Sequence, residues 1–181
     1  MLDMVEMVID SIRVSLVSQQ RIVILRELDA KRYLPIWIGI YEAEAIAIAL
    51  QEVEVARPLT HDLLKNIFST LKANIIRVEI VALRDDTFFG NLVVEANDLS
   101  FDIDARPSDA LALAVRSHVP ILVERSVLDS AGIVPEEDLR EKEGKPPTKD
   151  DVEANPERLS VFEDFLDKLD HEKKSDDQET E

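Results

Sequence analysis

The chain of 181 residues has no cysteine and only four glycines. The absence of cysteine excludes disulfides, thiolate catalysis and cysteine-based zinc sites. With so few glycines, the sequence has neither a phosphate-binding loop nor a dinucleotide-binding fingerprint. The three histidines are scattered without an HExxH motif, and no serine lies in a GxSxG elbow. The residues left as candidates for chemistry are therefore carboxylates, arginines and isolated histidines.

Basic residues are also scarce, because 21 lysines and arginines face 38 aspartates and glutamates and leave a net charge of -17. Residues 1–133 carry 20 acids and 13 bases, a net charge of -7, and the rest of the chain carries the larger excess of -10. A polyanion does not attract nucleic acid without local compensation. A phosphate-handling site in this chain therefore needs a local arginine cluster, a metal ion, or both.

Long hydrophobic runs are missing as well. The N-terminal MLDMVEMVID carries acids where a signal peptide would carry lysine or arginine. No apolar run approaches the roughly 18 residues of a membrane-spanning helix. We therefore expect a cytoplasmic protein that does not enter a membrane. Hydrophobic residues make up 45% of the composition, and a chain of this length can bury one substantial core.

Short β-branched and apolar runs, separated by polar breaks, predict two meanders of three strands each. Tight turns at Asp85-Asp86 and Asn97-Asp98 are predicted to join the strands of the second meander, because these residues favour two-residue hairpin loops. The predicted strands occupy residues 4–16, 21–28 and 33–38 in the first meander and residues 75–84, 87–96 and 99–104 in the second.

The segment IWIGIYEAEAIAIAL, residues 36–50, is echoed 65 residues later by FDIDARPSDALALAV, residues 101–115. Each copy runs from a strand through an acidic turn into a helix of alanine and large aliphatic residues. The echo predicts an α+β fold of duplicated β-β-β-α units. A helix without a polar face must be buried on all sides. We therefore expect two buried central helices, packed together between small mixed or antiparallel sheets.

A second kind of helix is predicted between the two units, over residues 56–73, with Thr60 as its N-cap and an apolar stripe of leucine, isoleucine and phenylalanine. A last strand over residues 121–124 and a short helix capped by Ser126 complete the expected domain. We place that domain at residues 1–134, followed by a charged linker at 135–155, an amphipathic helix at 156–170 and a disordered acidic tail at 171–181. The amphipathic helix would need a surface to dock on, in this subunit or in a protein partner.

Acids and arginines gather at the starts of the predicted helices. Asp102 and Asp104 point the same way because alternate residues of a strand share a face, and Asp109 follows about one turn into the next helix. These three carboxylates and Arg106 could converge on one strand-to-helix corner. Oxygen-rich sites suit Mg²⁺ or Mn²⁺. A divalent ion beside an arginine suits a phosphodiester, because the ion polarises the phosphoryl oxygen while the guanidinium binds the remaining oxygens. His61 is a candidate extra ligand or base.

A purely structural explanation of the same residues stays open. The helix dipole favours acids in a first helical turn by about 0.3–1 kcal/mol each, and Thr60 and Ser108 are ordinary caps. The arginines that precede prolines are held in an extended conformation and could simply pair with these acids. A cap requires neither His61 nor Asp104, which favours a functional role for those two. The second copy of the echo alone carries an Asp-Arg pair, Asp104 and Arg106, and this asymmetry also favours a task for its corner.

The motifs LPIWIGIYEAEAIAIAL, RPLTHDLL, TFFGNLVV, IDARPSDALALAVR and VPILVE, in this order, resemble the bifunctional nuclease family over residues 4–134. The resemblance implies a duplicated α+β domain that dimerises and that degrades both DNA and RNA. On the matching positions it implies a functional cluster at Glu42, Arg57, Thr60, His61, Asp62, Asp104, Arg106, Ser108 and Asp109.

The chemistry of these residue types suggests a role for each. As a hypothesis, Asp104, Asp109 and Glu42 hold the divalent cation, and His61, with Asp62 behind it, acts as the base. The expected substrate-binding residues are Arg57, Arg106, Thr60 and Ser108. No organic cofactor is expected.

Two other classes of function compete with a nuclease. The acidic body and the lack of a basic, aromatic surface favour a non-catalytic, homo-oligomeric binding or scaffold protein. A sensor of a small acidic ligand could use the same arginines.

Overall fold

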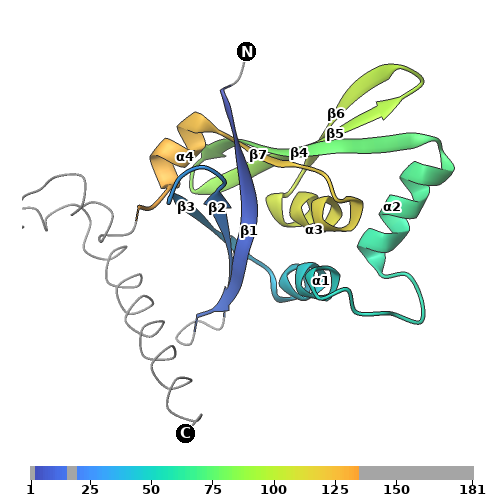
Figure 1. The fold of residues 1–181 in the computed structure, drawn as a ribbon, viewed down its shortest axis with the longest axis horizontal. Helices are drawn as coiled ribbons and strands as arrows, with labels where there is room; N and C mark the ends of the chain where they lie inside the picture. The colour runs from blue at the N-terminus through green and yellow to red at the C-terminus, as the bar shows by residue number, and fades with distance from the viewer. Residues whose placement is uncertain (1–2, 16–19, 135–181) are drawn as a thin grey trace, which may run out of the picture. The chain divides into compact units, whose positions relative to one another are not determined.

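The computed structural model describes residues 3–15 and 20–134, so the predicted linker, C-terminal helix and tail lie outside the described residues. The described chain contains seven strands and four helices (Figure 1). The strands are β1 Met4–Val14, β2 Arg21–Glu27, β3 Tyr33–Ile38, β4 Ala73–Arg84, β5 Thr87–Ala96, β6 Leu99–Ala105 and β7 Ile121–Glu124. The helices are α1 Ile40–Leu50, α2 Thr60–Thr70, α3 Pro107–Ser117 and α4 Arg125–Ala131. The α+β class and the strands expected from the sequence are confirmed.

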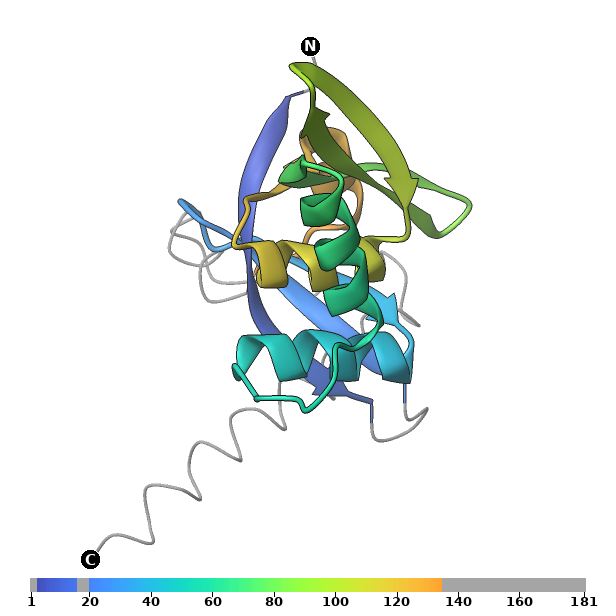
Figure 2. The ribbon, with the colours of Figure 1, turned by 90° about the vertical axis from the view of Figure 1, so that its right-hand side faces the viewer.

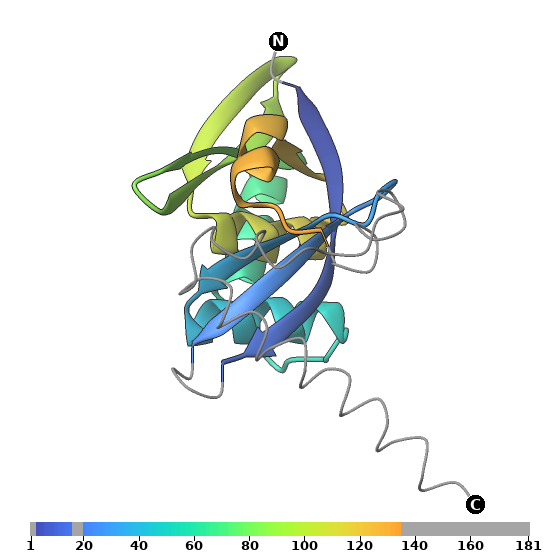
Figure 3. The ribbon, with the colours of Figure 1, turned by 90° about the vertical axis from the view of Figure 1, so that its left-hand side faces the viewer.

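The seven strands form one sheet in the order β3-β2-β1-β7-β4-β5-β6, so the expectation of separate small sheets is wrong. Each meander is antiparallel, and the four-residue strand β7 joins them. β7 pairs antiparallel with β1, where Val5 faces Val123, and parallel with β4, where Val78 faces Ile121. Figure 3 shows the first meander with α1 behind it.

The two turns predicted in the second meander are confirmed. Asp85, Asp86, Asn97 and Asp98 all have φ between 48° and 61°. Aspartate and asparagine tolerate this left-handed conformation better than most residues, and two such residues in succession suit the twist of a hairpin. The β5–β6 turn sets the register that pairs Gly90 with Ala105, at the point where β6 gives way to α3.

The two alanine-rich helices pack against each other, as expected, but they differ in burial. α3 lies against α1 on one side and against β4 and β5 on the other, and most of its residues are buried. α1 contacts α3 and β2 and buries only Ala43 and Ile46, while Ile40 and Leu50 are exposed. The prediction of two buried central helices is therefore right for α3 and wrong for α1. Figure 2 shows the two helices side by side, with α2 running across α3.

The helix starts use different caps from those predicted. Leu59, not Thr60, is the N-cap of α2, and its backbone N–H donates to Asp62 Oδ2 at 2.8 Å. Arg106 is the N-cap of α3, with Pro107 in the first helical turn. In α4 the cap is Glu124, whose carboxylate accepts a hydrogen bond from the Ser126 backbone. Thr60, Ser108 and Ser126 are thus not caps.

Helix α2 contributes little to the hydrophobic core. His61 is its one buried residue, and the leucines and isoleucine of its predicted stripe, Leu63, Leu64, Ile67 and Leu71, are exposed. None of the helices in the described ranges is long and apolar enough to cross a membrane.

Candidate active site

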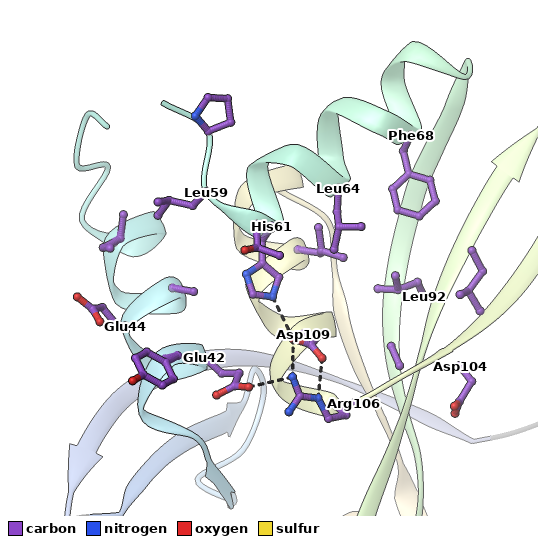
Figure 4. A pocket seen from close by; sticks show the side chains of 18 residues that line it. Glu42, Glu44, Leu59, His61, Leu64, Phe68, Leu92, Asp104, Arg106 and Asp109 are labelled. Atoms are coloured by element: carbon purple, nitrogen blue, oxygen red, sulfur yellow. Dashed lines mark hydrogen bonds and ion pairs between the residues drawn. The ribbon is translucent and has the colours of Figure 1, made fainter. Parts of the chain in front are cut away.

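A cleft of about 1160 Å³ opens where α1, α2, β6 and the start of α3 meet (Figure 4). It gathers most of the residues that the sequence singled out. The predicted site residues that line the cleft are Glu42, Thr60, His61, Asp104, Arg106 and Asp109. Arg57, Asp62 and Ser108 do not line it.

Four side chains in the cleft form one connected network. His61 Nε2 lies 3.1 Å from Asp109 Oδ1. Arg106 holds the same carboxylate with two hydrogen bonds, from Nε to Oδ2 at 2.8 Å and from Nη2 to Oδ1 at 3.2 Å. Arg106 Nη2 also lies 2.9 Å from Glu42 Oε1. The network therefore joins the starts of three helices, because Glu42, His61 and Asp109 lie in the first turns of α1, α2 and α3.

The Arg106 side chain is 67% exposed although two carboxylates bind it. Hydrogen bonding and the negative charge of Asp109, with a smaller contribution from Glu42, raise the pKa of Arg106 above its ordinary value. The guanidinium is therefore charged at every physiological pH. Among the described residues Nη1 has no partner, so its two N–H groups are free to donate to a ligand.

Asp109 is ionised in this setting. Burial alone would raise the pKa of its carboxyl group, but hydrogen bonds from Arg106 and His61 and the charge of Arg106 together lower that pKa below 3.8, its ordinary value. An ionised Asp109 accepts from the imidazole of His61 and holds the ring in a fixed orientation. The pairing of a buried histidine with a carboxylate suits proton transfer.

Asp62 faces away from the cleft and binds a buried arginine. Its Oδ1 accepts from Arg116 Nε at 2.6 Å, while its Oδ2 accepts from the Leu59 backbone. The Arg116 side chain is 6% exposed and also donates from Nη1 to the Ala112 carbonyl at 2.9 Å. Burial would raise the pKa of Asp62, but the hydrogen bonds that its carboxylate accepts from the Leu59 backbone and from Arg116, together with the charge of Arg116, lower that pKa overall. The residue behind His61 is thus Asp109 and not Asp62, contrary to the sequence-based pairing.

The remaining predicted residues stand apart from the network. Asp104 is exposed on β6, and Figure 4 shows its side chain well away from Arg106. Thr60 is exposed at the rim of the cleft. Ser108 is buried in the first turn of α3. Arg57 is exposed in the segment between α1 and α2, and its guanidinium makes no ion pair within residues 3–15 and 20–134.

Comparison with known proteins shows that residues 23–136 match the family profile of the bifunctional nuclease domain. The chain belongs to the bifunctional nuclease domain family. The resemblance seen in the sequence motifs is thereby confirmed.

Relatives of this bifunctional nuclease domain occur in bacteria and in plants. An uncharacterized protein of Mycobacterium tuberculosis is 40% identical over 158 residues, which cover 87% of this chain and 90% of that protein. Bifunctional nuclease 2 of Oryza sativa is 30% identical over 118 residues, which cover 64% of this chain and 36% of the plant protein. Bifunctional nuclease 2 of Arabidopsis thaliana is 28% identical over 105 residues, or 55% of this chain and 31% of that protein.

A divalent cation does not fit the acids of this bifunctional nuclease domain as they are arranged. The described residues contain no group of three or more histidine, aspartate or glutamate side chains placed to hold a metal. Both oxygens of Asp109 and one oxygen of Glu42, Oε1, already accept from Arg106 or His61. A cation placed beside them would be repelled by the guanidinium at close range.

Two residues that position the site were missed by sequence reasoning. Arg116 lies seven residues after Asp109, about two helical turns, and so on the same face of α3. This spacing was the available signal. Gly90 lies beneath the β6–α3 corner, where a Cβ atom would stand 3.0 Å from the Ala105 carbonyl oxygen and 3.4 Å from the Pro107 Cα. Glycine permits this close approach, and the corner that it supports carries Arg106.

Proposed function

We propose that this protein is a nuclease that hydrolyses phosphodiester bonds of DNA, RNA or both. The observation that carries the proposal is the network of His61, Asp109 and Arg106 on an open cleft, in a chain of the bifunctional nuclease domain family. The network combines a candidate base, a group that orients it, and an exposed cation with free donors, which is the minimum that phosphodiester hydrolysis needs.

Arg106 is the proposed phosphate-binding residue. Asp109 and Glu42 hold three of its N–H contacts in place, which leaves the Nη1 donors to bind the oxygens of the scissile phosphate. Negative charge on those oxygens grows as the nucleophile attacks, and a fixed guanidinium stabilises it without reorganisation. Glu42 and Asp109 thus act by positioning Arg106.

His61 is the proposed general base. In the tautomer that carries its proton on Nε2, the ring donates to Asp109, and Nδ1 can accept a proton from a water molecule. That water attacks the phosphorus, the bond to the leaving oxygen breaks, and the proton taken up by His61 returns to the leaving oxygen. DNA lacks a 2′-hydroxyl, so a mechanism common to DNA and RNA uses water as the nucleophile.

The first test is hydrolysis of single-stranded DNA and RNA by the purified full chain, with Mg²⁺, with Mn²⁺ and with EDTA. We expect His61→Ala to abolish hydrolysis and Asp104→Ala, prepared identically, to retain it, because Asp104 stands outside the network. Loss of activity in both variants, together with a metal requirement, would support the metal site predicted at Asp104, Asp109 and Glu42. Activity unchanged in both would assign hydrolysis to another site or to a contaminant.

A second candidate function is a non-catalytic, homo-oligomeric binding protein. Exposed apolar residues favour it, because Trp37 at the end of β3 and Ile40, Tyr41 and Leu50 of α1 all face water. Such a set suits an interface between two copies of the chain. Absence of hydrolysis in every sample, with a stable dimer in sedimentation experiments, would favour this function over the nuclease.

A further inference from the structure

The cleft continues past His61 into a region lined mainly by apolar side chains, with Asp104 beside it (Figure 4). We call this region the apolar trough and define it by Leu64 and Phe68 of α2, Leu92 of β5 and Ile103 of β6. In Figure 4, Leu64, Phe68 and Leu92 lie on the side of His61 opposite to Glu42. Leu64 and Phe68 are four residues apart and so share one face of the helix. The trough and the charged network are therefore two halves of one cleft.

The core of the domain uses only part of the apolar trough, since Leu92 belongs to the core and Phe68 packs against it. Leu92 forms its buried floor, but Leu64 is 37% exposed and Ile103 is 38% exposed. Helix α2 buries no apolar residue completely, because His61 is its one buried side chain. Apolar side chains around an open cleft favour a ligand that removes them from water.

The charges of the cleft indicate that phosphate contacts alone cannot supply its affinity for a nucleic acid. Arg106 is the one basic residue in the lining, against the four acids Glu42, Glu44, Asp104 and Asp109. Two of those acids already bind the guanidinium. Electrostatic binding of a polyanion requires several neutralised phosphates, so most of the affinity must come from the uncharged part of the ligand.

We infer that the apolar trough is a binding site for one unpaired nucleobase, whose attached phosphate lies at Arg106. The inference rests on the proposed nuclease function and names its substrate class. A base has flat apolar faces that can stack on the Phe68 ring, and such stacking is tolerant of sequence. A base is also joined to its phosphate through the sugar, so the base can occupy the trough while the phosphate lies at Arg106 in the adjoining part of the same cleft. A paired base cannot enter without leaving its duplex, so the substrate is single-stranded.

Binding to a labelled single strand of ten thymidines, compared with a strand of the same length in which all ten positions are stable abasic sites, tests the inference. We expect the abasic strand to bind the full chain at least about tenfold more weakly, since each stacked base contributes an effect of that order. Phe68→Ala should weaken binding of the normal strand by a similar factor and leave the abasic strand unchanged. Phe89→Ala is the matched control, because Phe89 is also partly exposed but lies outside the cleft.

Two further measurements show whether a loss of binding comes from misfolding of one variant or from changed phosphate contacts. Ile103→Thr should reproduce the loss, because it removes apolar surface from an exposed strand position and keeps a β-branched side chain. The logarithm of the binding constant should fall with the logarithm of salt concentration with a slope of about -0.7, the value for a single phosphate contact on a single strand. A slope several times steeper would overturn the inference.

Other outcomes separate this inference from the proposed function. Equal binding and equal hydrolysis of normal and abasic strands would refute the nucleobase site and leave the nuclease intact. Base-dependent binding without any hydrolysis would refute the nuclease and keep the site. If Phe68→Ala and Ile103→Thr instead changed the oligomeric state in sedimentation, the trough would be a contact between copies of the chain and the inference would fall.

Discussion

Asp109 is the residue on which the proposed site depends, because its two oxygens accept from both His61 and Arg106. Asp109→Asn keeps the shape of the side chain but replaces one acceptor by an NH₂ donor. The imidazole would then be held in the wrong tautomer, and a change of this kind lowers turnover by about 10⁴-fold where a carboxylate orients a catalytic histidine. Steady-state hydrolysis of a single-stranded oligonucleotide measures the loss. Asp102→Asn, the same change at an exposed position on β6 outside the cleft, should retain activity, and equal activity of the two variants would contradict the proposed role.

Arg106 supplies both charge and geometry, and the two can be separated. Arg106→Lys keeps the positive charge but loses the planar fork that binds Asp109 and Glu42 and presents two free donors. Because a hydrogen bond to a charged group contributes about 1.5–3 kcal/mol, we expect kcat/KM to fall roughly 10- to 100-fold. Unfolding in urea should change little, since the side chain is mostly exposed. Arg57→Lys is the control, and a loss equal to that of Arg106→Lys would show that both arginines bind substrate.

The sequence alone could indicate which residues belong to the site, but not which of them contact each other. His61, Arg106 and Asp109 were candidates because of their motifs and their places at helix starts. The pairing of His61 with Asp109 spans 48 residues and depends on how α2 crosses α3, which no local pattern encodes. Asp62 seemed the natural partner of His61 by adjacency, but neighbouring residues of a helix point about 100° apart, and Asp62 therefore faces Arg116.

Among the elements, α2 is the helix that polar contacts hold in place. Three of its side chains contact α3: His61 binds Asp109, Asp62 binds Arg116, and Lys65 donates to the Arg116 carbonyl. Arg116→Met would leave Asp62 without its cationic partner and remove a buried guanidinium. Breaking a buried pair costs about 3–5 kcal/mol. Asp62 is partly exposed, so we expect the free energy of unfolding in urea to drop by about 2–3 kcal/mol.

The exposed pair of Arg125 with Asp3 is the control for this prediction. Arg125→Met should change the free energy of unfolding little, because solvent screens an exposed ion pair. Hydrolysis by Arg116→Met should fall as well if α2 must be fixed for His61 to meet Asp109. A loss of stability no larger than that of the control would contradict the idea that this buried pair holds α2.

The strands were predictable to within a few residues because alternation and hairpin turns are local signals. Burial of the helices was less predictable. The alanine-rich pattern of α1 indicated burial on all sides, yet its outward face is exposed in a single copy of the chain. The union of two meanders into one sheet depends on β7, a strand of four residues whose partners lie about 40 and 115 residues away along the chain. Such pairing is decided by the global fold.

The pH dependence of stability combines the net charge of the whole molecule with the effect of two partly buried carboxylates, Asp62 and Asp109. The pKa values of Asp62 and Asp109 are both lowered in the folded protein. A carboxyl group with a lower pKa in the folded state stabilises that state above its unfolded pKa, near 3.8, and loses the contribution as the pH falls through the folded pKa. Acid also removes negative charge from a chain of net charge -17, and this loss of self-repulsion acts in the opposite direction.

The double variant Asp62→Asn, Asp109→Asn separates these opposing effects. We expect it to be less stable than the wild type at pH 7, because Arg116 and Arg106 lose their ionised partners. The gap should narrow as the pH falls below about 4, since the wild type then protonates the same two groups. Urea unfolding of both proteins from pH 7 to pH 2.5 measures the gap. Curves that stay parallel below pH 4 would mean that neither carboxylate has a lowered pKa, and acid would then act on this protein through its overall charge alone.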